Sequence, residues 1–403
     1  MSSSHDVIDV IDVIVIGAGI SGLSAAFYAA RAGRRCLVLE KAKVLGGSIH
    51  TTRTSDGFWY ELGAHTLYNS YGSLLEMLTA CNLRDAVLER TKAPYRMLVD
   101  GKVRSVPSQL AVGELFASAW RAFTERKTGK SVGAYYGRLV GKGNWKHVFS
   151  PLLSAVPSQH ADDFPAEMLF KRRPRRKDFP RTFSLKNGLS TLVDGLARVE
   201  GVTVQAGVEV RSIARHAAGF VVTAEDGTQS STSKLVLAAP ADVSATLLAP
   251  VLPAAFTALS KVRMAAIVST GVHAARSAIA LPRLAGLVPV DDVFFSAVSR
   301  DVLPDDRFRG LAFHFRDGLS REQRLERIAK VTATDRGTFL EVSERQGSLP
   351  SPELGHSEIV RALDEAIAKS GIYLAGNYFG GLALEDCVLR SKAEVERLLS
   401  EKD

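Results

Sequence analysis

The stretch IDVIVIGAGISGLSAAFYAARAGRRCLVLEKAKVLGGSIH, residues 11–50, decides the fold of this chain. It opens with an apolar run to Gly17, of the kind that forms a buried strand in a parallel sheet. Apolar residues then recur at helical spacing from Ile20 until Gly33, where a glycine typically ends a helix. Arg34 to Glu40 reads as a second buried strand. A strand, a helix and a strand in about thirty residues predict a βαβ unit.

A glycine-rich loop joins the first strand to the helix. Gly17, Gly19 and Gly22 have the GxGxxG spacing, and the loop stands between a strand and a helix, as dinucleotide binding requires. The first glycine permits a tight turn, the second lets the backbone approach a pyrophosphate, and the third allows the helix to pack closely on the strand. The first helical residues, Ile20 and Ser21, then present free N–H groups to the phosphates. The loop predicts a dinucleotide site.

An acidic residue, Glu40, ends the second strand. A carboxylate at this position can accept both hydroxyls of an adenosine ribose, and it repels a 2′-phosphate. These two effects disfavour NADP and leave NAD or FAD as the cofactor.

A second pair of glycines, Gly46 and Gly47, follows within a longer motif. The segment LEKAKVLGGSIHTTRTSDGFWYELGAH, residues 39–65, resembles the N-terminal signature of the flavin amine oxidase and protoporphyrinogen oxidase superfamily. The resemblance implies an FAD site in which Gly46 and Gly47 pass close to the pyrophosphate. In it, Gly63, Ala64 and His65 run along the flavin ring.

Two further blocks resemble the same superfamily. VEVRSI, residues 208–213, matches the strand where a valine, here Val210, meets the adenine through its backbone. GIYLAGNYFGGLALEDCV, residues 371–388, is most similar to the protoporphyrinogen oxidases. In that comparison Gly376 and Asn377 lie by the pyrophosphate or the ribityl chain. Backbone N–H groups of residues 381–383 reach the flavin pyrimidine edge at a helix start, where they stabilise negative charge. The predicted cofactor-binding residues are Gly17, Gly19, Ile20, Ser21, Gly22, Glu40, Lys41, Gly46, Gly47, Ser48, Gly63, Ala64, His65, Val210, Ala239, Gly376, Asn377, Gly381, Leu382 and Ala383.

Several positions depart from the superfamily pattern. Ser48 stands where amine oxidases commonly carry arginine, and Ser391 replaces a glycine usual in the last helix. Residues 330–370 hold no cysteine for covalent attachment, so the flavin is expected to be noncovalent. The aromatic pair that cages an amine is not evident, because Tyr373 belongs to a strand and Tyr378 is the single candidate. These departures favour the protoporphyrinogen oxidase side and leave the substrate open.

His65 is the one candidate catalytic residue. Near a flavin it could orient a substrate or act as a base, and its GAHT context also resembles UDP-galactopyranose mutases. A histidine that only hydrogen-bonds to backbone fits the same residues. The chain supplies no other evident acid or base, which is compatible with dehydrogenation by hydride transfer to flavin N5.

Composition narrows the class of protein. The chain has 403 residues, 46% hydrophobic and 23% charged, which is typical of a folded protein with two domains or one domain and a large insertion. No apolar run is long enough to span a membrane and the first residues lack a secretory signal, so a cytoplasmic protein is expected. The three cysteines show no metal or disulfide spacing, and no histidine set indicates a metal site.

A basic run, KRRPRRKDFPR, occupies residues 171–181 and contributes to the net charge of +8, with seven of its eleven residues basic. A solvated loop is the simpler interpretation. Residues 171–177 could alternatively touch an anionic membrane or an acidic substrate. The run lacks the aromatic interleaving that is typical of nucleic-acid-binding segments, so nucleic acid is not an expected partner.

We therefore predict an α/β fold with a doubly wound FAD-binding domain, Rossmann-like and of the glutathione-reductase type. This domain is discontinuous, from residues 9–95, 187–250 and 365–403. An α+β substrate domain is inserted as residues 96–186 and 251–364, with a helical stretch over residues 112–126.

The predicted activity is that of an FAD-dependent oxidase or dehydrogenase that desaturates a small organic substrate by hydride transfer and passes the electrons to oxygen or another acceptor. A flavin amine oxidase and a non-redox flavoenzyme of the mutase type are the alternatives. The oligomeric state stays open.

Overall fold

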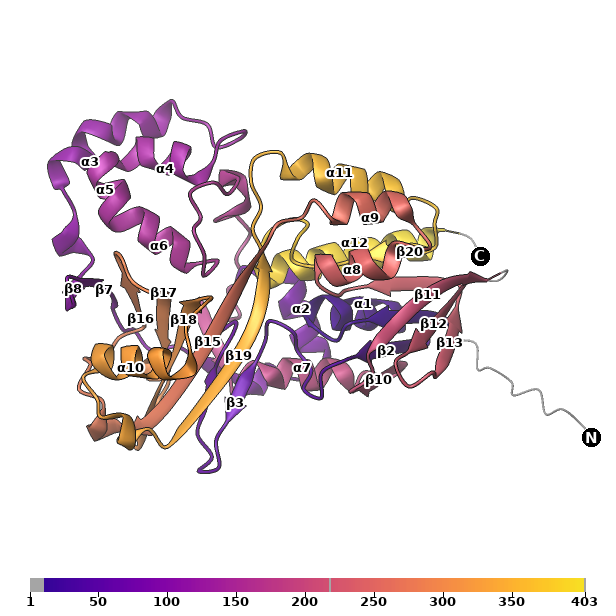
Figure 1. Cartoon of the computed structure of the whole chain (residues 1–403), viewed down its shortest axis with the longest axis horizontal. Helices are drawn as coiled ribbons and strands as arrows, with labels where there is room; N and C mark the ends of the chain where they lie inside the picture. Colours follow the sequence, from indigo (N-terminus) through magenta and orange to yellow (C-terminus); the bar gives the residue numbers. More distant parts are fainter. Residues whose placement is uncertain (1–10, 217–218, 402–403) are drawn as a thin grey trace, which may run out of the picture.

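A five-stranded parallel sheet carries the predicted βαβ unit (Figure 1). The computed structural model describes residues 11–216 and 219–401, so positions 9, 10, 402 and 403 of the predicted FAD-binding domain lie outside the described residues. The strand order is β10, β2, β1, β14, β20. Their bounds are β1 (Val13–Ile16), β2 (Cys36–Glu40), β10 (Val202–Ala206), β14 (Lys234–Leu237) and β20 (Ile372–Leu374).

Both faces of this sheet are covered because its apolar side chains alternate between them. In β1, Val13 and Val15 enter one core cluster, while Ile14 and Ile16 enter another. The first cluster is completed by α1 (Ile20–Arg31), α2 (Gly72–Ala80), α7 (Ser190–Ala197) and α12 (Leu384–Ser400). The second is completed by β11 (Val210–His216), β12 (Gly219–Ala224), α8 (Ala241–Leu248), α9 (Pro253–Leu259) and α11 (His356–Ile367). The predicted α/β fold class is confirmed.

Some segments expected in the substrate domain pack with the parallel sheet. Apolar residues of α9 and α11 lie in the second core cluster, although both helices fall within or across the predicted range 251–364. Likewise β9 (Thr182–Leu185) pairs with β5 (Leu67–Tyr68) and β6 (Val87–Glu89), which belong to the first predicted segment. The predicted domain boundaries follow changes in hydrophobic periodicity along the chain. Such changes do not indicate which hydrophobic core a helix packs into.

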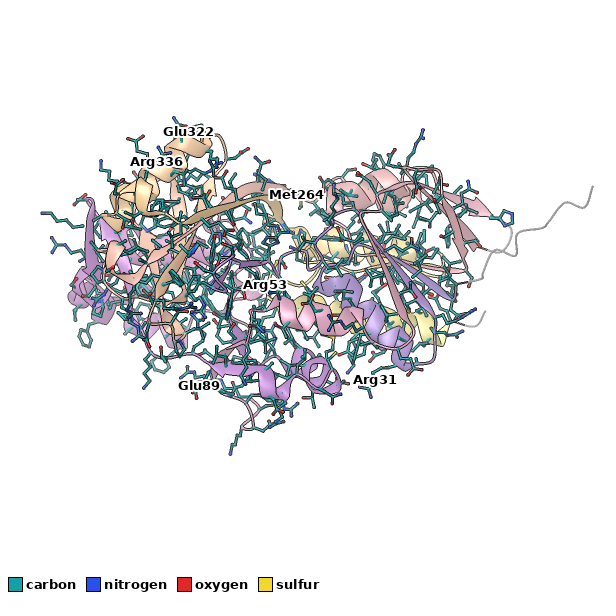
Figure 2. The ribbon with its side chains drawn as sticks, turned by 90° about the horizontal axis from the view of Figure 1, so that it is seen from below. Arg31, Arg53, Glu89, Met264, Glu322 and Arg336 are labelled. Atoms are coloured by element: carbon teal, nitrogen blue, oxygen red, sulfur yellow. The ribbon has the colours of Figure 1, made fainter. Side chains whose placement is uncertain are left out.

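A mixed seven-stranded sheet forms the other half of the molecule. Its order is β19 (Glu341–Pro350), β15 (Met264–Ala275), β18 (Phe308–Arg316), β17 (Phe294–Ser299), β16 (Gly286–Pro289), β7 (Tyr95–Val99) and β8 (Lys102–Ser105). Helix α10 (Arg321–Thr332) packs on it through Leu325 and Ile328. Figure 2 shows Met264, where β15 begins, between the two halves, with Glu322 in one half and Arg31 in the other. The long strands β15 and β19 therefore connect the halves.

A helical lobe, residues 111–170, stands beside the mixed sheet (Figure 1). It contains α3 (Val112–Ser118), α4 (Val132–Val140), α5 (Lys142–Asn144) and α6 (Ser150–Ala155), and it has a small core of its own. The helix expected over 112–126 is shorter: α3 ends at Ser118 and a 3-10 helix, η3 (Ala119–Phe123), continues it. Thr124 and the residues after it leave the helix, because the following Glu125 turns back toward Lys130 and Arg138.

The described residues contain neither a membrane-spanning helix nor a disulfide. No helix in residues 11–216 or 219–401 is both long and apolar enough to cross a bilayer. Cys36 and Cys387 are buried free thiols, and Cys81 is a half-buried one. Burial raises the pKa of Cys36 to about 12, so this thiol stays protonated and unreactive at neutral pH.

Candidate functional site

The predicted cofactor residues meet at one edge of the parallel sheet. Gly17 follows β1, Lys41 follows β2, and Ala239 and Gly376 each come two residues after β14 and β20. The strands are parallel neighbours, so their carboxyl ends share this edge. Ligands of open α/β sheets bind in the crevice outside this edge.

The first glycine loop is packed so tightly that side chains cannot enter it. A Cβ atom on Gly22 would lie 1.8 Å from the carbonyl oxygen of Gly17. Gly17 has φ +101° and a Cβ there would lie 2.9 Å from the carbonyl oxygen of Ala238, on the neighbouring strand connection. The first and third glycines are therefore needed for the turn and for the packing of α1 on β1, as predicted from their spacing.

The second glycine pair packs directly on the first loop. The N–H of Gly46 donates to the carbonyl of Ala18 at 2.9 Å. Gly47 has φ +58°, and a Cβ on it would lie 2.9 Å from the Cα of Gly19. Glycine is required here because two backbone segments touch without space for a side chain between them. Gly46 and Gly47 thus extend the glycine loop into a single surface of backbone.

Gly63 and Ala64 join the same surface. Ala64 donates its N–H to the carbonyl of Ser48 at 2.9 Å. A Cβ on Gly63 would lie 2.1 Å from that carbonyl oxygen. Gly47 and the Ser48 side chain are exposed to solvent on the open side. The backbone of residues 46–48 is therefore held between residues 17–19 and 63–64, with one face free for a ligand.

Glu40 is fixed at the end of β2 by backbone hydrogen bonds. One carboxylate oxygen accepts the N–H of Ala18 at 2.7 Å, and the other accepts the N–H of Ala42 at 2.9 Å. Each oxygen keeps a further lone pair for a hydroxyl donor. The backbone carbonyl of Glu40 accepts the N–H of Val208, which brings the strand beginning at Val210 to the same edge. Lys41 is exposed and pairs with Glu209 at 3.8 Å.

The C-terminal motif ends at a helix start, as predicted. Ala383 is the N-cap of α12, and Gly381 has φ +144°, a conformation that favours glycine. Leu382 packs on the core of the helical lobe, so its side chain is structural and its backbone remains for a ligand. The unusual Ser391 is buried in α12 and donates a hydrogen bond to the carbonyl of Ser21 at 2.8 Å. This bond ties α12 to the start of α1, a role that glycine could not fill.

The basic run is not simply a solvated loop. Lys171 and Arg173 both bind the buried carboxylate of Asp386, at 2.9 Å and 2.6 Å. Lys171 also donates to the carbonyl of Gly380. Asp386 lies in the first turn of α12, next to the residues predicted at the flavin edge. Part of the run therefore clamps this turn, which spacing along the chain could not reveal because the partners are over two hundred residues apart.

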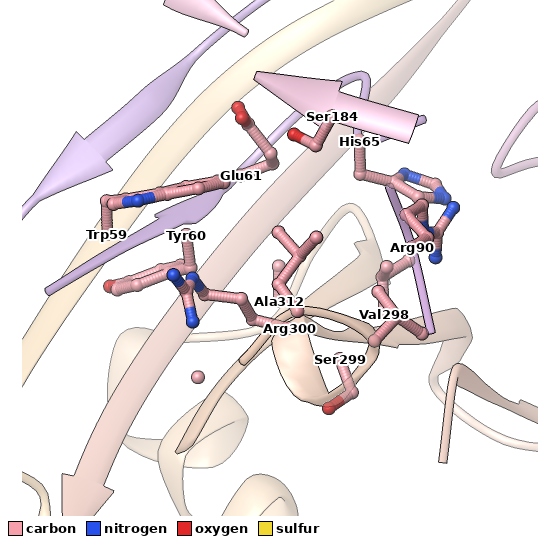
Figure 3. A pocket seen from close by; sticks show the side chains of 13 residues that line it. Trp59, Tyr60, Glu61, His65, Arg90, Ser184, Val298, Ser299, Arg300 and Ala312 are labelled. Atoms are coloured by element: carbon pink, nitrogen blue, oxygen red, sulfur yellow. The ribbon is translucent and has the colours of Figure 1, made fainter. Parts of the chain in front are cut away.

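His65 lies beside a small cavity between the parallel-sheet half and the mixed sheet (Figure 3). Its Nδ1 is 3.4 Å from the carbonyl oxygen of Gly63. Burial, the nearby Arg90 guanidinium and His314 lower the pKa of His65 to about 3. The imidazole is neutral at physiological pH and is a weak base, so the structure favours hydrogen bonding over proton abstraction.

Other polar side chains line this cavity, and none of them is among the residues predicted from the sequence motifs. Figure 3 shows Glu61, Ser184 and Arg90 along its wall, with Arg300 next to Tyr60. The cavity of about 20 Å³ has room for one water molecule. Burial raises the pKa of Glu61 to about 7. The one signal available for Glu61 was an acidic residue in the apolar strand β4 (Trp59–Glu61).

Arg345 on β19 is a further residue that sequence reasoning missed. Burial lowers its pKa, and the nearby carboxylate of Glu40 raises it. The pKa of His50 is lowered by burial and by Arg345. A guanidinium from the mixed sheet therefore stands near Glu40 at the end of β2, where the adenosine ribose is expected.

Tyr378 does not fit an amine cage. Its ring is 1% exposed and belongs to the core cluster under α8 and α9. A Cβ on Gly376 would lie 2.5 Å from this ring. Tyr378 supports the backbone of the predicted cofactor loop from below, so the single candidate for an amine cage does not face a substrate. Tyr373 lies in β20, as predicted.

The parallel sheet and its glycine-lined edge have the architecture that dinucleotide-binding α/β proteins share. Residues 20–399 match the model of one protein family, described as flavin containing amine oxidoreductase. The chain belongs to this family, and it is a flavin-dependent oxidoreductase.

Relatives of known name include a protoporphyrinogen oxidase and phytoene desaturases. Protoporphyrinogen oxidase 1 of Arabidopsis thaliana is 24% identical over 94% of this chain and 86% of that protein. A 15-cis-phytoene desaturase of Synechococcus elongatus is 40% identical over 18% of this chain. This chain spans 15% of the length of that desaturase.

Solved structures share the whole fold. A protein assigned as a protoporphyrinogen oxidase from Exiguobacterium sp. 255-15 has a TM-score of 0.78 and 20% identity, and the match covers 100% of both chains. Reduced UDP-galactopyranose mutase has a TM-score of 0.72 and 14% identity, covering 96% of this chain and 95% of that one. At these identities the likeness shows the fold alone.

Proposed function

We propose that the chain is an FAD-dependent oxidoreductase that desaturates a small organic substrate. The observation that carries the proposal is the contact of Gly47 with Gly19, because it makes one backbone surface from two glycine loops. An NAD dehydrogenase has no need for the second loop. The doubly wound FAD-binding domain of the glutathione-reductase type and its inserted substrate domain belong to the same proposal.

The donor set at the sheet edge fits FAD. Glu40 would accept the adenosine ribose hydroxyls, and the N-terminus of α1 with the glycine loops would hold the pyrophosphate. Arg345 would add positive charge near Glu40. The start of α12 would face the flavin pyrimidine edge, and no cysteine stands in residues 330–370 for a covalent link. When bound, the flavin supplies a hydride acceptor at N5.

On the substrate side, the residues of this chain would position the substrate rather than abstract a proton from it. His65 is neutral and hydrogen-bonded to backbone, so it would orient a polar group of the substrate. The mixed sheet and the apolar wall of the cavity would exclude water from the reacting face. Electrons would leave to oxygen or to another acceptor.

The cofactor is tested by purifying the full chain and identifying any flavin released by heat. We expect flavin absorbance and FAD in the supernatant. The Gly47→Ala variant should lose most of its flavin, because a methyl group would separate the two loops. Gly57→Ala is the matched control, since Gly57 has a similar positive φ of 80° with open space around it. Colourless wild-type protein that cannot be reconstituted with FAD would reject the proposal.

A mutase-type flavoenzyme is a second candidate, supported by His65 in its GAHT context and by the shared fold with the mutase. Such an enzyme needs reduced flavin and produces no net electron transfer. Bleaching of the bound flavin by a desaturable substrate would exclude it. Turnover with amines and peroxide release would instead favour an amine oxidase.

A further inference from the structure

The start of α12 presents backbone donors that the chain itself does not use. Within the described part of the chain, no hydrogen-bond acceptor faces the N–H groups of Leu382, Ala383, Leu384 and Glu385. Leu384 and Glu385 are buried, at 5% and 2% exposure. Because buried N–H groups are nearly always paired, these donors fit an acceptor on a bound flavin, such as a carbonyl oxygen of its pyrimidine edge.

Two carboxylates stand in the first turn of the same helix, and they point to different places. Glu385 turns toward α2, where its oxygens accept the N–H groups of Ser73 and Leu74 at 2.9 Å and 3.0 Å. Asp386 turns toward the candidate flavin edge, since a Cβ atom on Gly381 would lie 2.6 Å from its Oδ2. A negative charge at that place opposes a second negative charge on the flavin ring.

Two cations of the basic run bind the Asp386 carboxylate. Its Oδ1 accepts Lys171 Nζ at 2.9 Å and Arg173 Nη2 at 2.6 Å. The side chains of Asp386 and Arg173 are 6% and 16% exposed, so solvent and salt screen their charges weakly. Lys171 also donates to the carbonyl of Gly380. We call Lys171, Arg173 and Asp386 the clamp, and it carries one more positive charge than negative charge.

We propose that Lys171 and Arg173 are positioning residues that raise the reduction potential of the bound flavin by compensating Asp386. A hydride delivered to N5 brings two electrons and one proton, so the reduced ring gains one negative charge. The clamp offsets the Asp386 charge beside this ring, and the N–H groups at the start of α12 are left to stabilise the new charge. The inference rests on the proposed function, because it needs a flavin at this edge.

The size of the effect follows from one unit of charge. Two unit charges roughly 10 Å apart, at an effective dielectric constant of about 20, shift each other's equilibria about tenfold. A tenfold change corresponds to about 30 mV for a two-electron couple. Loss of one cation should therefore lower the potential, and loss of the Asp386 charge should raise it.

The test is the reduction potential of the flavin in the full chain loaded with FAD, measured by equilibration with dyes of known potential. Arg173→Gln should lower the potential by about 30 mV, and Asp386→Asn should raise it by about the same amount. Opposite signs separate charge from looser packing, because both variants weaken the same contact. Arg173→Lys keeps the charge and should restore the wild-type potential. Lys171→Gln should act like Arg173→Gln and replaces it if that variant does not fold.

A second measurement uses sulfite as the probe. Sulfite bonds to N5 through its sulfur lone pair and leaves the ring with a negative charge, so its dissociation constant reports how well that charge is stabilised. Bleaching of the flavin absorbance measures this constant. We expect it to be about tenfold higher in Arg173→Gln and about tenfold lower in Asp386→Asn than in the wild type. Arg172→Gln is the control, since Arg172 is exposed, and should change it less than about twofold.

Two results would overturn the inference and leave the proposed function intact. One is the same potential in the wild type, Arg173→Gln and Asp386→Asn, each with FAD bound. The other is a shift of the same sign in both variants, which would assign the clamp to packing alone. Wild-type protein that binds no FAD would reject the proposed function and this inference with it, so the two failures are distinguishable.

Discussion

The edge of the parallel sheet and the interior of the mixed sheet are held together by different means. At the edge, backbone meets backbone, as where Gly47 touches Gly19. In the mixed-sheet half, buried charges meet each other, as where Arg309 binds Asp301 at 2.6 Å with side chains 6% and 2% exposed. The first arrangement requires glycine at set positions, and a reader of the sequence can find it. The second requires only two residues that the fold brings together, so local sequence carries no sign of it.

The largest expected effect is removal of Asp301. Its carboxylate accepts Nε and Nη2 of Arg309 and also the N–H of Leu284. Asp301→Ala would leave the Arg309 guanidinium buried without a counter-charge, which costs about 3–5 kcal/mol of unfolding free energy. Urea unfolding followed by circular dichroism measures this loss of unfolding free energy.

An exposed pair serves as the control for Asp301. Arg361 and Glu365 are 74% and 73% exposed at 4.0 Å, so Glu365→Ala should change stability by less than about 0.5 kcal/mol. Joint replacement of Asp301 and Arg309 by apolar residues should recover part of the loss. If Asp301→Ala cost no more than Glu365→Ala, the contrast between the two halves would be lost.

Gly22→Ala tests the backbone packing at the edge of the parallel sheet. The new methyl group would lie 1.8 Å from the carbonyl oxygen of Gly17 and would push α1 off β1. We expect a loss of about 3 kcal/mol and loss of bound flavin. Gly113→Ala, at the start of α3 with no atom within 4 Å, should instead stabilise the chain by about 1 kcal/mol. Equal melting temperatures for the two variants would contradict the packing argument.

Much of the cofactor edge was predictable because its steric and electrostatic requirements involve residues close in sequence. The GxGxxG loop, Glu40 and the Gly46–Gly47 pair stand within thirty residues, and each need is steric or electrostatic at a known offset. The substrate side was not predictable. Arg90 and Glu61 come from different elements, and only tertiary packing brings them to the same cavity.

Two misreadings have the same cause. The basic run was interpreted from its own charge, whereas its partner, Asp386, lies in the last helix. Tyr378 was the single candidate for an amine cage, whereas its ring turns into the core under Gly376. In both cases the direction of a side chain depends on an element distant in sequence.

The raised pKa of Glu61, beside the cavity between the two halves, can be tested through the pH dependence of stability. Its carboxylate accepts the N–H of Leu189 and the hydroxyl of Thr51, and burial raises its pKa from 4.5 to about 7. The folded chain therefore holds a proton that the unfolded chain releases above pH 4.5, and the stability present below that pH is lost as pH rises through 7. Between pH 5 and 8, the wild type should lose about 2 kcal/mol of unfolding free energy, and the Glu61→Gln variant should not.

The measurement is the pH dependence of urea unfolding for both proteins. His65 has the opposite sign, because its pKa is lowered to about 3, so its stabilising effect is lost as pH falls below about 6.5. His65→Gln should therefore flatten the acid side of the same profile. Parallel profiles for wild type and Glu61→Gln would show that Glu61 is ionised in the folded chain.

The smallest effect is expected where the basic run meets the candidate flavin edge. Arg173→Gln removes a charged hydrogen bond of 2.6 Å to Asp386, while Lys171 keeps its own bond at 2.9 Å. We expect a loss of about 1.5 kcal/mol and faster release of bound flavin, because the turn before α12 becomes looser. Arg172→Gln is the control, since Arg172 is exposed beside it. Flavin release at equal rates in the two variants would mean that the clamp stabilises the fold without reaching the cofactor edge.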